Sequence, residues 1–132
     1  MKFEFLEHTA DIKFRAYGKN IEEKFSNSAK AMFFSMCEDS IKKTISKEIK
    51  IDGTDMKSLL YNFLEELLFL FDSEGFFLSE ILNIQIDKEK FELVVKIIGD
   101  KGKGYEMLTD VKAVTYNDME INNEFIQVVL DI

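Results

Sequence analysis

Two aspartates near opposite ends of the chain have the chemistry to bind a metal ion together. Asp11 precedes a stretch in which apolar and polar residues alternate, and Asp131 ends an apolar run, one residue before Ile132. If the strands that carry them pair, the carboxylates converge, and at about 4.5 Å they repel by roughly 4 kcal/mol at an effective dielectric of about 20. A bound cation would reverse that repulsion, and oxygen ligands favour Ca²⁺ or Mg²⁺ over zinc or copper. The spacing alone favours a simpler interpretation, in which two unrelated aspartates end two strands.

Other residue patterns that carry chemistry are weak or absent in the sequence. The stretch GDKGKGYE lacks the Gly-Lys-Ser/Thr ending of a phosphate-binding loop, and neither HExxH nor CxxC occurs. The one histidine, His8, could act as a general base, but no nucleophile obviously pairs with it, which favours a histidine hydrogen-bonded within its own turn. The one cysteine, Cys37, lies in an apolar stretch, which predicts a buried, unreactive thiol.

Composition limits the classes of function. The 132 residues, 46% of them hydrophobic, fit a single domain over 1–132. The net charge of −8 opposes strong direct binding of RNA or DNA and favours docking on a basic partner or collecting cations. The longest strongly apolar run, LLFLF, is far shorter than the roughly 20 residues that span a bilayer. The expectation is a cytoplasmic protein with no membrane partner.

Two helices and seven strands are expected from the periodicity of apolar residues. Asn20 should cap a helix that ends near 38–40, and Thr54 or Asp55 should cap a second helix that ends before Gly75. Acidic residues on the second helix, at Glu65 and Glu66 and again at Asp72 and Glu74, are typical of a solvated face, although carboxylates at a helix end also suggest local pairing or a partner. Strands are expected over 2–6, 12–17, 41–51, 76–87, 91–98, 108–116 and 124–131, with a mobile glycine-rich loop over 99–104.

This order of elements predicts the fold class. Short joints between the later strands suit antiparallel pairing, and the broad apolar stripe on the second helix requires packing across a sheet. The expectation is an α+β single domain in which two helices pack on one mixed, largely antiparallel sheet.

Four separated motifs then suggest a family. They are HTADI with Gly18 after the following strand, the helix LLYNFLEELLFLFDSEG, the stretch DVKAVTY, and the terminal VVLDI. Together and in this order they resemble the archease family from end to end. The resemblance implies a small acidic accessory protein, not an enzyme, that activates the GTP-dependent tRNA-splicing RNA ligase by promoting its guanylylation and multiple turnover.

The same resemblance implies which residues act. It places a divalent cation, calcium in the usual description, at the carboxylates of Asp11 and Asp131 and at the backbone carbonyl of Ile132. Lys112 matches a family lysine tied to activation, although a solvent-facing strand residue would look the same in this sequence. Asn117 stands where many members carry histidine, and Phe63 stands where many carry tryptophan.

Two other functions use the same residues differently. A metal-dependent phosphoester hydrolase could use the paired carboxylates to position an attacking water. A chaperone-like binding domain would need no metal at all.

Overall fold

The structure, a computed structural model, describes residues 1–8 and 10–132, and this part of the chain contains two helices and seven strands in the order ββαβαββββ. Every strand pairing is antiparallel. The predicted α+β class, with two helices against antiparallel strands, is therefore confirmed. The elements are β1 (Phe3–Leu6), β2 (Ile12–Tyr17), α1 (Ile21–Met36), β3 (Ile45–Asp52), α2 (Met56–Glu74), β4 (Phe76–Asp87), β5 (Glu92–Lys101), β6 (Ala113–Ile121) and β7 (Phe125–Asp131).

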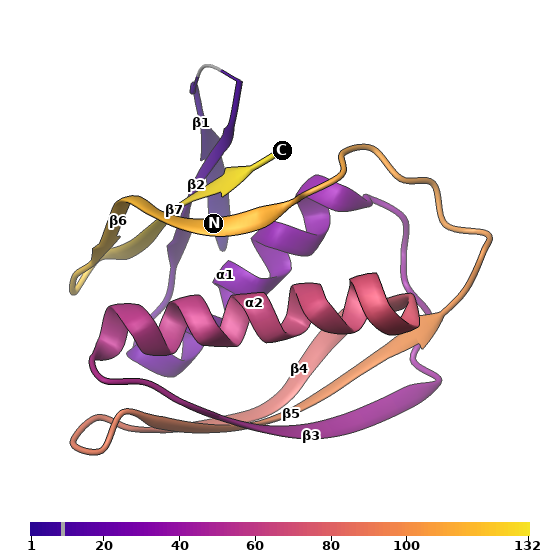
Figure 1. The fold of residues 1–132 in the computed structure, drawn as a ribbon. Coiled ribbons are helices and arrows are strands. Elements are labelled where there is room, and N and C mark those ends of the chain that lie inside the picture. Colours follow the sequence, from indigo (N-terminus) through magenta and orange to yellow (C-terminus); the bar gives the residue numbers. More distant parts are fainter. Residues whose placement is uncertain (9) are drawn as a thin grey trace.

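The strands form two sheets where one was expected. One sheet has the order β1-β2-β7-β6 and the other β3-β5-β4, and both helices lie between them (Figure 1). On one side α1 packs against β2 and β7 and on the other against β4, while α2 contacts β6 as well as β3 and β4. Each helix therefore buries apolar residues toward two layers, which explains the broad apolar stripe on α2.

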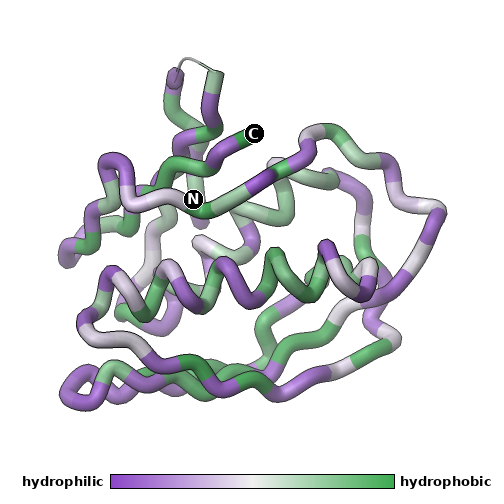
Figure 2. Tube along the Cα trace, viewed as in Figure 1, coloured by the Kyte–Doolittle hydropathy of each residue, from purple (hydrophilic) through white to green (hydrophobic). Residues whose placement is uncertain are grey.

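Most of the buried hydrophobic side chains form one cluster between the layers. Phe14 from β2, Phe25 from α1 and Leu64 from α2 are fully buried within it, as is Val95 from β5. Hydrophobic residues recur along both helices and along the strands, whereas the turn between β4 and β5 is hydrophilic (Figure 2). The helices thus supply the apolar layer that joins two sheets with no strand in common.

Both helix starts follow the capping chemistry in the sequence. The side-chain oxygen of Asn20 accepts a hydrogen bond from the Glu23 amide at 2.8 Å. At α2 the cap is Asp55, not Thr54, and Asp55 and Ser58 each accept from the other's backbone amide. The helix ends at Gly75, whose φ of 69° is a left-handed conformation that glycine adopts without strain.

Two predicted strand limits are wrong, for physical reasons. The strand expected over 41–51 begins at Ile45, because the segment before it turns onto β4, where the Ser79 hydroxyl donates to the Ile41 carbonyl at 2.9 Å. The strand expected over 108–116 begins at Ala113 and runs to Ile121, because Leu108 donates to the Met36 carbonyl at the end of α1 instead of to a strand.

The glycine-rich segment is also more ordered in its pairing than expected. Strand β5 continues through Gly99 to Lys101, and Gly99 pairs with Ile45 on one side and Leu78 on the other. A Cβ atom at Gly99 would lie 1.9 Å from the Phe77 carbonyl oxygen, so only glycine fits between these strands. The irregular segment therefore starts after Lys101.

Candidate functional site

The register of the first sheet brings Asp11 and Asp131 to the same end. Ile12 pairs with Leu130 in the antiparallel β2–β7 ladder, and the two aspartates each lie one residue beyond that pair. The chain thus carries both aspartates past the same end of this strand pair. Asp11 and Asp131, separated by nearly the whole sequence, therefore lie at one tip of the sheet.

Lys112 reaches the same tip from the other side of β7. Its backbone amide donates to the Asp131 carbonyl oxygen at 2.8 Å, and Ala113, the next residue, pairs with Asp131. The side chain of Lys112 is exposed, and so is Ile132. Four residues singled out in the sequence are thus neighbours, because β7 lies between β2 and β6.

His8 also belongs to this tip. Its Nδ1 lies 3.5 Å from Asp11 Oδ2, and both side chains are about 30% exposed. Thr9, within the HTADI motif, lies outside the described residues. The i,i+3 spacing of His8 and Asp11 could have indicated this contact from the sequence. A cation bound to Asp11 would compete with His8 for the same carboxylate.

A groove of about 280 Å³ lies beside Asp11. Its walls come from the first two strands, from Phe34, Ser35 and Glu38 at the end of α1, and from Leu108 and Thr109. Sequence reasoning did not find this groove, because its walls come from four separate segments. It gives the tip a concave surface next to the candidate carboxylates.

The oxygen donors at the tip suit a hard cation, but they are too few to complete its coordination shell. Within residues 1–8 and 10–132, no three His, Cys, Asp or Glu side chains group closely enough to hold a metal. Asp11 and Asp131 with the Ile132 carbonyl would supply oxygens of the kind that Ca²⁺ and Mg²⁺ prefer, and Ca²⁺ takes six to eight. Water or a partner would have to supply the remaining ligands.

The acidic residues of α2 do not form one solvated face. Glu65 Oε2 accepts from the Val114 amide at 2.9 Å and so fixes the start of β6. Glu74 lies 3.0 Å from Lys47 Nζ and 3.3 Å from Lys101 Nζ, and hydrogen bonds from these lysines lower its pKa. The pKa of Asp72 is raised, first by partial burial and then by the charge of Asp110.

Other sequence predictions concern residues away from the tip. Cys37 is buried with only 6% of its surface exposed, and burial raises the pKa of its thiol, as expected for an inert core cysteine. Phe63 is buried and stacks on Phe25 with ring centroids 6.0 Å apart, which is a packing role. Asn117 is exposed, and its amide donates to the Thr115 hydroxyl at 3.3 Å.

Neither α1 nor α2, the helices of the described residues, combines the length and the apolar character that a membrane span requires.

Comparison with known proteins gives consistent matches along the chain. A sequence model of the Archease protein family matches residues 3–132. "Protein archease" of Sulfurisphaera tokodaii is 44% identical over 93% of this chain and 90% of its own length, and that of Methanosarcina barkeri is 39% identical over 99% and 96%. The solution structure of Methanobacterium thermoautotrophicum protein 1598 superposes with a TM-score of 0.83, at 35% identity over 99% of both chains.

Proposed function

Because the chain belongs to the archease family, we propose that it is an accessory protein that activates the GTP-dependent tRNA-splicing RNA ligase. It would act by promoting guanylylation of the ligase and multiple turnover, and would itself catalyse no reaction. The protein would bind the ligase directly, and both would act in the cytoplasm. The net charge of −8 supports docking on a basic surface of that partner more than direct binding of RNA.

The observation that carries the proposal is the meeting of Asp11, Asp131 and Lys112 at one tip. Asp11 and Asp131 each lie one residue beyond the paired Ile12 and Leu130, and the Lys112 amide donates to the Asp131 carbonyl oxygen, which supports the proposal. These are the residues that the family resemblance singles out, and they come from three distant parts of the sequence. Their shared position supports a single activating surface.

The tip would hold a divalent cation, Ca²⁺ or alternatively Mg²⁺. Asp11 and Asp131 would supply carboxylate oxygens, and Ile132 its backbone carbonyl. When bound, the ion would neutralise the repulsion between the carboxylates and present an open coordination position to the ligase. The exposed ammonium of Lys112 would lie beside it, where a point charge can contact a phosphate or balance the acidic tip.

A ligation assay with limiting ligase tests the proposal. Multiple turnover is expected with the parent protein and is expected to disappear with Asp131→Asn, while circular dichroism shows an unchanged fold. The matched control is Asp87→Asn, which makes the same charge change in the β4–β5 turn and keeps an oxygen to accept from the Glu89 and Lys90 amides. Full activation by Asp131→Asn would overturn the role of the tip.

Two further measurements separate the competing functions. Hydrolysis of RNA or simple phosphoesters by the purified protein alone, lost in Asp131→Asn, would replace the accessory role with that of a hydrolase. Calorimetric titration with Ca²⁺ and Mg²⁺ tests whether the protein binds either ion. Activation without any saturable heat would indicate a binding domain that needs no metal.

A further inference from the structure

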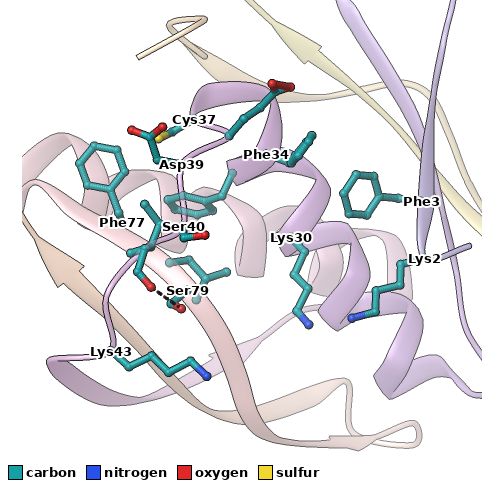
Figure 3. Close-up of a pocket in the computed structure, with 14 residues that line it drawn as sticks. Lys2, Phe3, Lys30, Phe34, Cys37, Asp39, Ser40, Lys43, Phe77 and Ser79 are labelled. Carbon is teal, nitrogen blue, oxygen red and sulfur yellow. Dashed lines mark hydrogen bonds between the residues drawn. The ribbon is translucent and has the colours of Figure 1, made fainter. Parts of the chain in front are cut away.

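A cavity of about 460 Å³ gathers three lysines from three separate segments. Lys2 precedes β1, Lys30 lies on α1, and Lys43 lies on the segment before β3. In Figure 3 the ammonium groups of Lys2 and Lys30 end close together, and Lys43 extends toward them from the opposite wall. We call this cavity the lysine pocket.

The charges of the lysine pocket are poorly balanced by the protein. Burial lowers the pKa of Lys30, and the charges of Lys2 and Lys43 lower it further, while Glu80 raises it. Glu80 Oε2 lies 2.7 Å from Lys43 Nζ, and its pKa is lowered by Lys43 first and by the other two lysines as well. The charges of all three lysines thus act on Glu80, whose ion pair is with Lys43.

Neither Lys2 nor Lys30 forms an ion pair with a carboxylate of the described residues. The ion pairs found among residues 1–8 and 10–132 involve other lysines and His8. In a chain with eight excess negative charges, an unpaired like-charge cluster costs free energy that a bound anion would remove. This imbalance is the reason to look for an anionic ligand here.

We propose that the lysine pocket binds the phosphate group of a small phosphate monoester. Lys2 and Lys30 would hold the phosphate oxygens with charge-assisted hydrogen bonds, and Lys43 would share its charge between Glu80 and the ligand. The exposed hydroxyl of Ser40 lines the same space. The site goes beyond the proposed function and requires neither the metal nor the ligase.

The rest of the pocket selects a compact ester over a polymer. Phe3 and Phe34 form an apolar lip, with ring centroids 5.6 Å apart, against which the organic part of an ester can pack. Glu38 and Asp39 line the opposite end, where Figure 3 shows the Asp39 carboxylate well away from the lysines. A second phosphate along a nucleic-acid chain would meet these carboxylates, so the geometry favours one phosphate per ligand.

Nuclear magnetic resonance titration of the full chain with inorganic phosphate and with phenyl phosphate tests this site. Both probes should cause saturable shifts at residues of the pocket, with phenyl phosphate binding several-fold tighter because of the apolar lip. Lys30→Gln should weaken phenyl phosphate binding by about tenfold, the loss expected of one charge-assisted hydrogen bond. Glu80→Gln should strengthen it, because the competing carboxylate is gone.

Matched controls keep the result interpretable. Lys57→Gln removes the same charge from the exposed start of α2 and should leave binding unchanged. Lys2→Gln repeats the test at an exposed position, in case Lys30→Gln perturbs the fold. Equal losses in Lys57→Gln and Lys30→Gln, tighter binding of an RNA oligomer than of phenyl phosphate, or no saturable shift would each overturn the proposal. Asp131→Asn should retain phosphate binding, so failure of this site and failure of ligase activation are distinguishable.

Discussion

The backbone amide of Lys112 donates a hydrogen bond to the carbonyl oxygen of Asp131 at 2.8 Å. The contact joins the lysine proposed to activate the ligase to an aspartate proposed to hold the ion, and it uses only backbone atoms. The side chain of Lys112 is left free to face solvent. Stability and activation should therefore respond to different changes at this residue.

Lys112→Gln is expected to abolish ligase activation while changing the free energy of unfolding by less than about 0.5 kcal/mol, as for an exposed side chain. Its Ca²⁺ affinity should stay near that of the parent. Lys112→Pro removes the amide donor and should cost about 1 kcal/mol or more of stability, with weaker Ca²⁺ binding. Ligation assays, urea denaturation and calorimetry measure the three quantities. Normal activation by Lys112→Gln would leave this lysine with only a surface role.

Lys24 should be essential for stability although it carries a charge. It is 5% exposed, and its ammonium donates to the carbonyl oxygens of Asn122 at 2.8 Å and Asn123 at 3.0 Å, in the turn between β6 and β7. Lys24→Met keeps most of the apolar stem but leaves both carbonyls without this donor, so a loss of about 1–3 kcal/mol is expected. Urea denaturation measures it, with Lys57→Met as the exposed control. Equal midpoints for the two variants would contradict the structural role of Lys24.

Gly99→Ala should be among the most damaging single substitutions in the chain. The added methyl would collide with the Phe77 carbonyl oxygen and the Phe76 ring, because β5 lies between two neighbours at that point. A loss of about 3 kcal/mol is expected. Gly104→Ala is the matched control, since nothing lies within 4 Å of its Cβ position, and it should change stability by less than about 0.5 kcal/mol. Thermal melts of both variants measure the two losses of stability.

The two acidic residues at the end of α2 should have opposite effects on stability. The folded state lowers the pKa of Glu74 below its ordinary value, so its ionised form stabilises the fold at neutral pH and this contribution is lost as pH falls through the folded pKa. The folded state raises the pKa of Asp72, so the fold loses stability as pH rises from the ordinary pKa of this carboxyl through the folded pKa. This loss is absent in strong acid, where the carboxyl is protonated in both states.

Thermal melts across pH should show the difference. At about pH 7, Glu74→Gln should lower the melting temperature and Asp72→Asn should raise it, because the first removes a favourable charge and the second an unfavourable one. As pH falls through the folded pKa of Glu74, the effect of Glu74→Gln should fade, and in strong acid both variants should approach the parent protein because both carboxylates are then protonated. Shifts of the same sign at neutral pH would show that the surroundings of one carboxylate have been misjudged.

The sequence predicted the helices well and the strand limits less well. Asn20 and Asp55 mark helix starts through local chemistry, which needs no tertiary information. The alternation in LTDVKAVTY continues through a segment whose amide at Leu108 bonds to the end of α1, so periodicity alone could not place the start of β6. Apolar stripes likewise show how much of a helix is buried but not whether one sheet or two cover it.

The candidate site was predictable only in part. The apolar pattern of the first and last strands alone favoured two unrelated strand-end aspartates, and a shared site of Asp11 and Asp131 was expected only through the resemblance to the archease family. Nothing in the sequence indicated the groove beside Asp11 or the lysine pocket. Lys2, Lys30 and Lys43 follow no common spacing, and only the packing of β1, α1 and the segment before β3 brings them together.

Strand β7 occupies an interior position, between β2 and β6, although it is the last element of the fold. During synthesis on the ribosome, β2 would emerge early. The hydrogen-bonding groups on its β7 side would stay unpaired until almost all the remaining residues had been added. Nascent chains with such a long delay fold slowly and offer an open edge to other chains. Truncation before Phe125 should therefore give an aggregating product and not a smaller folded one.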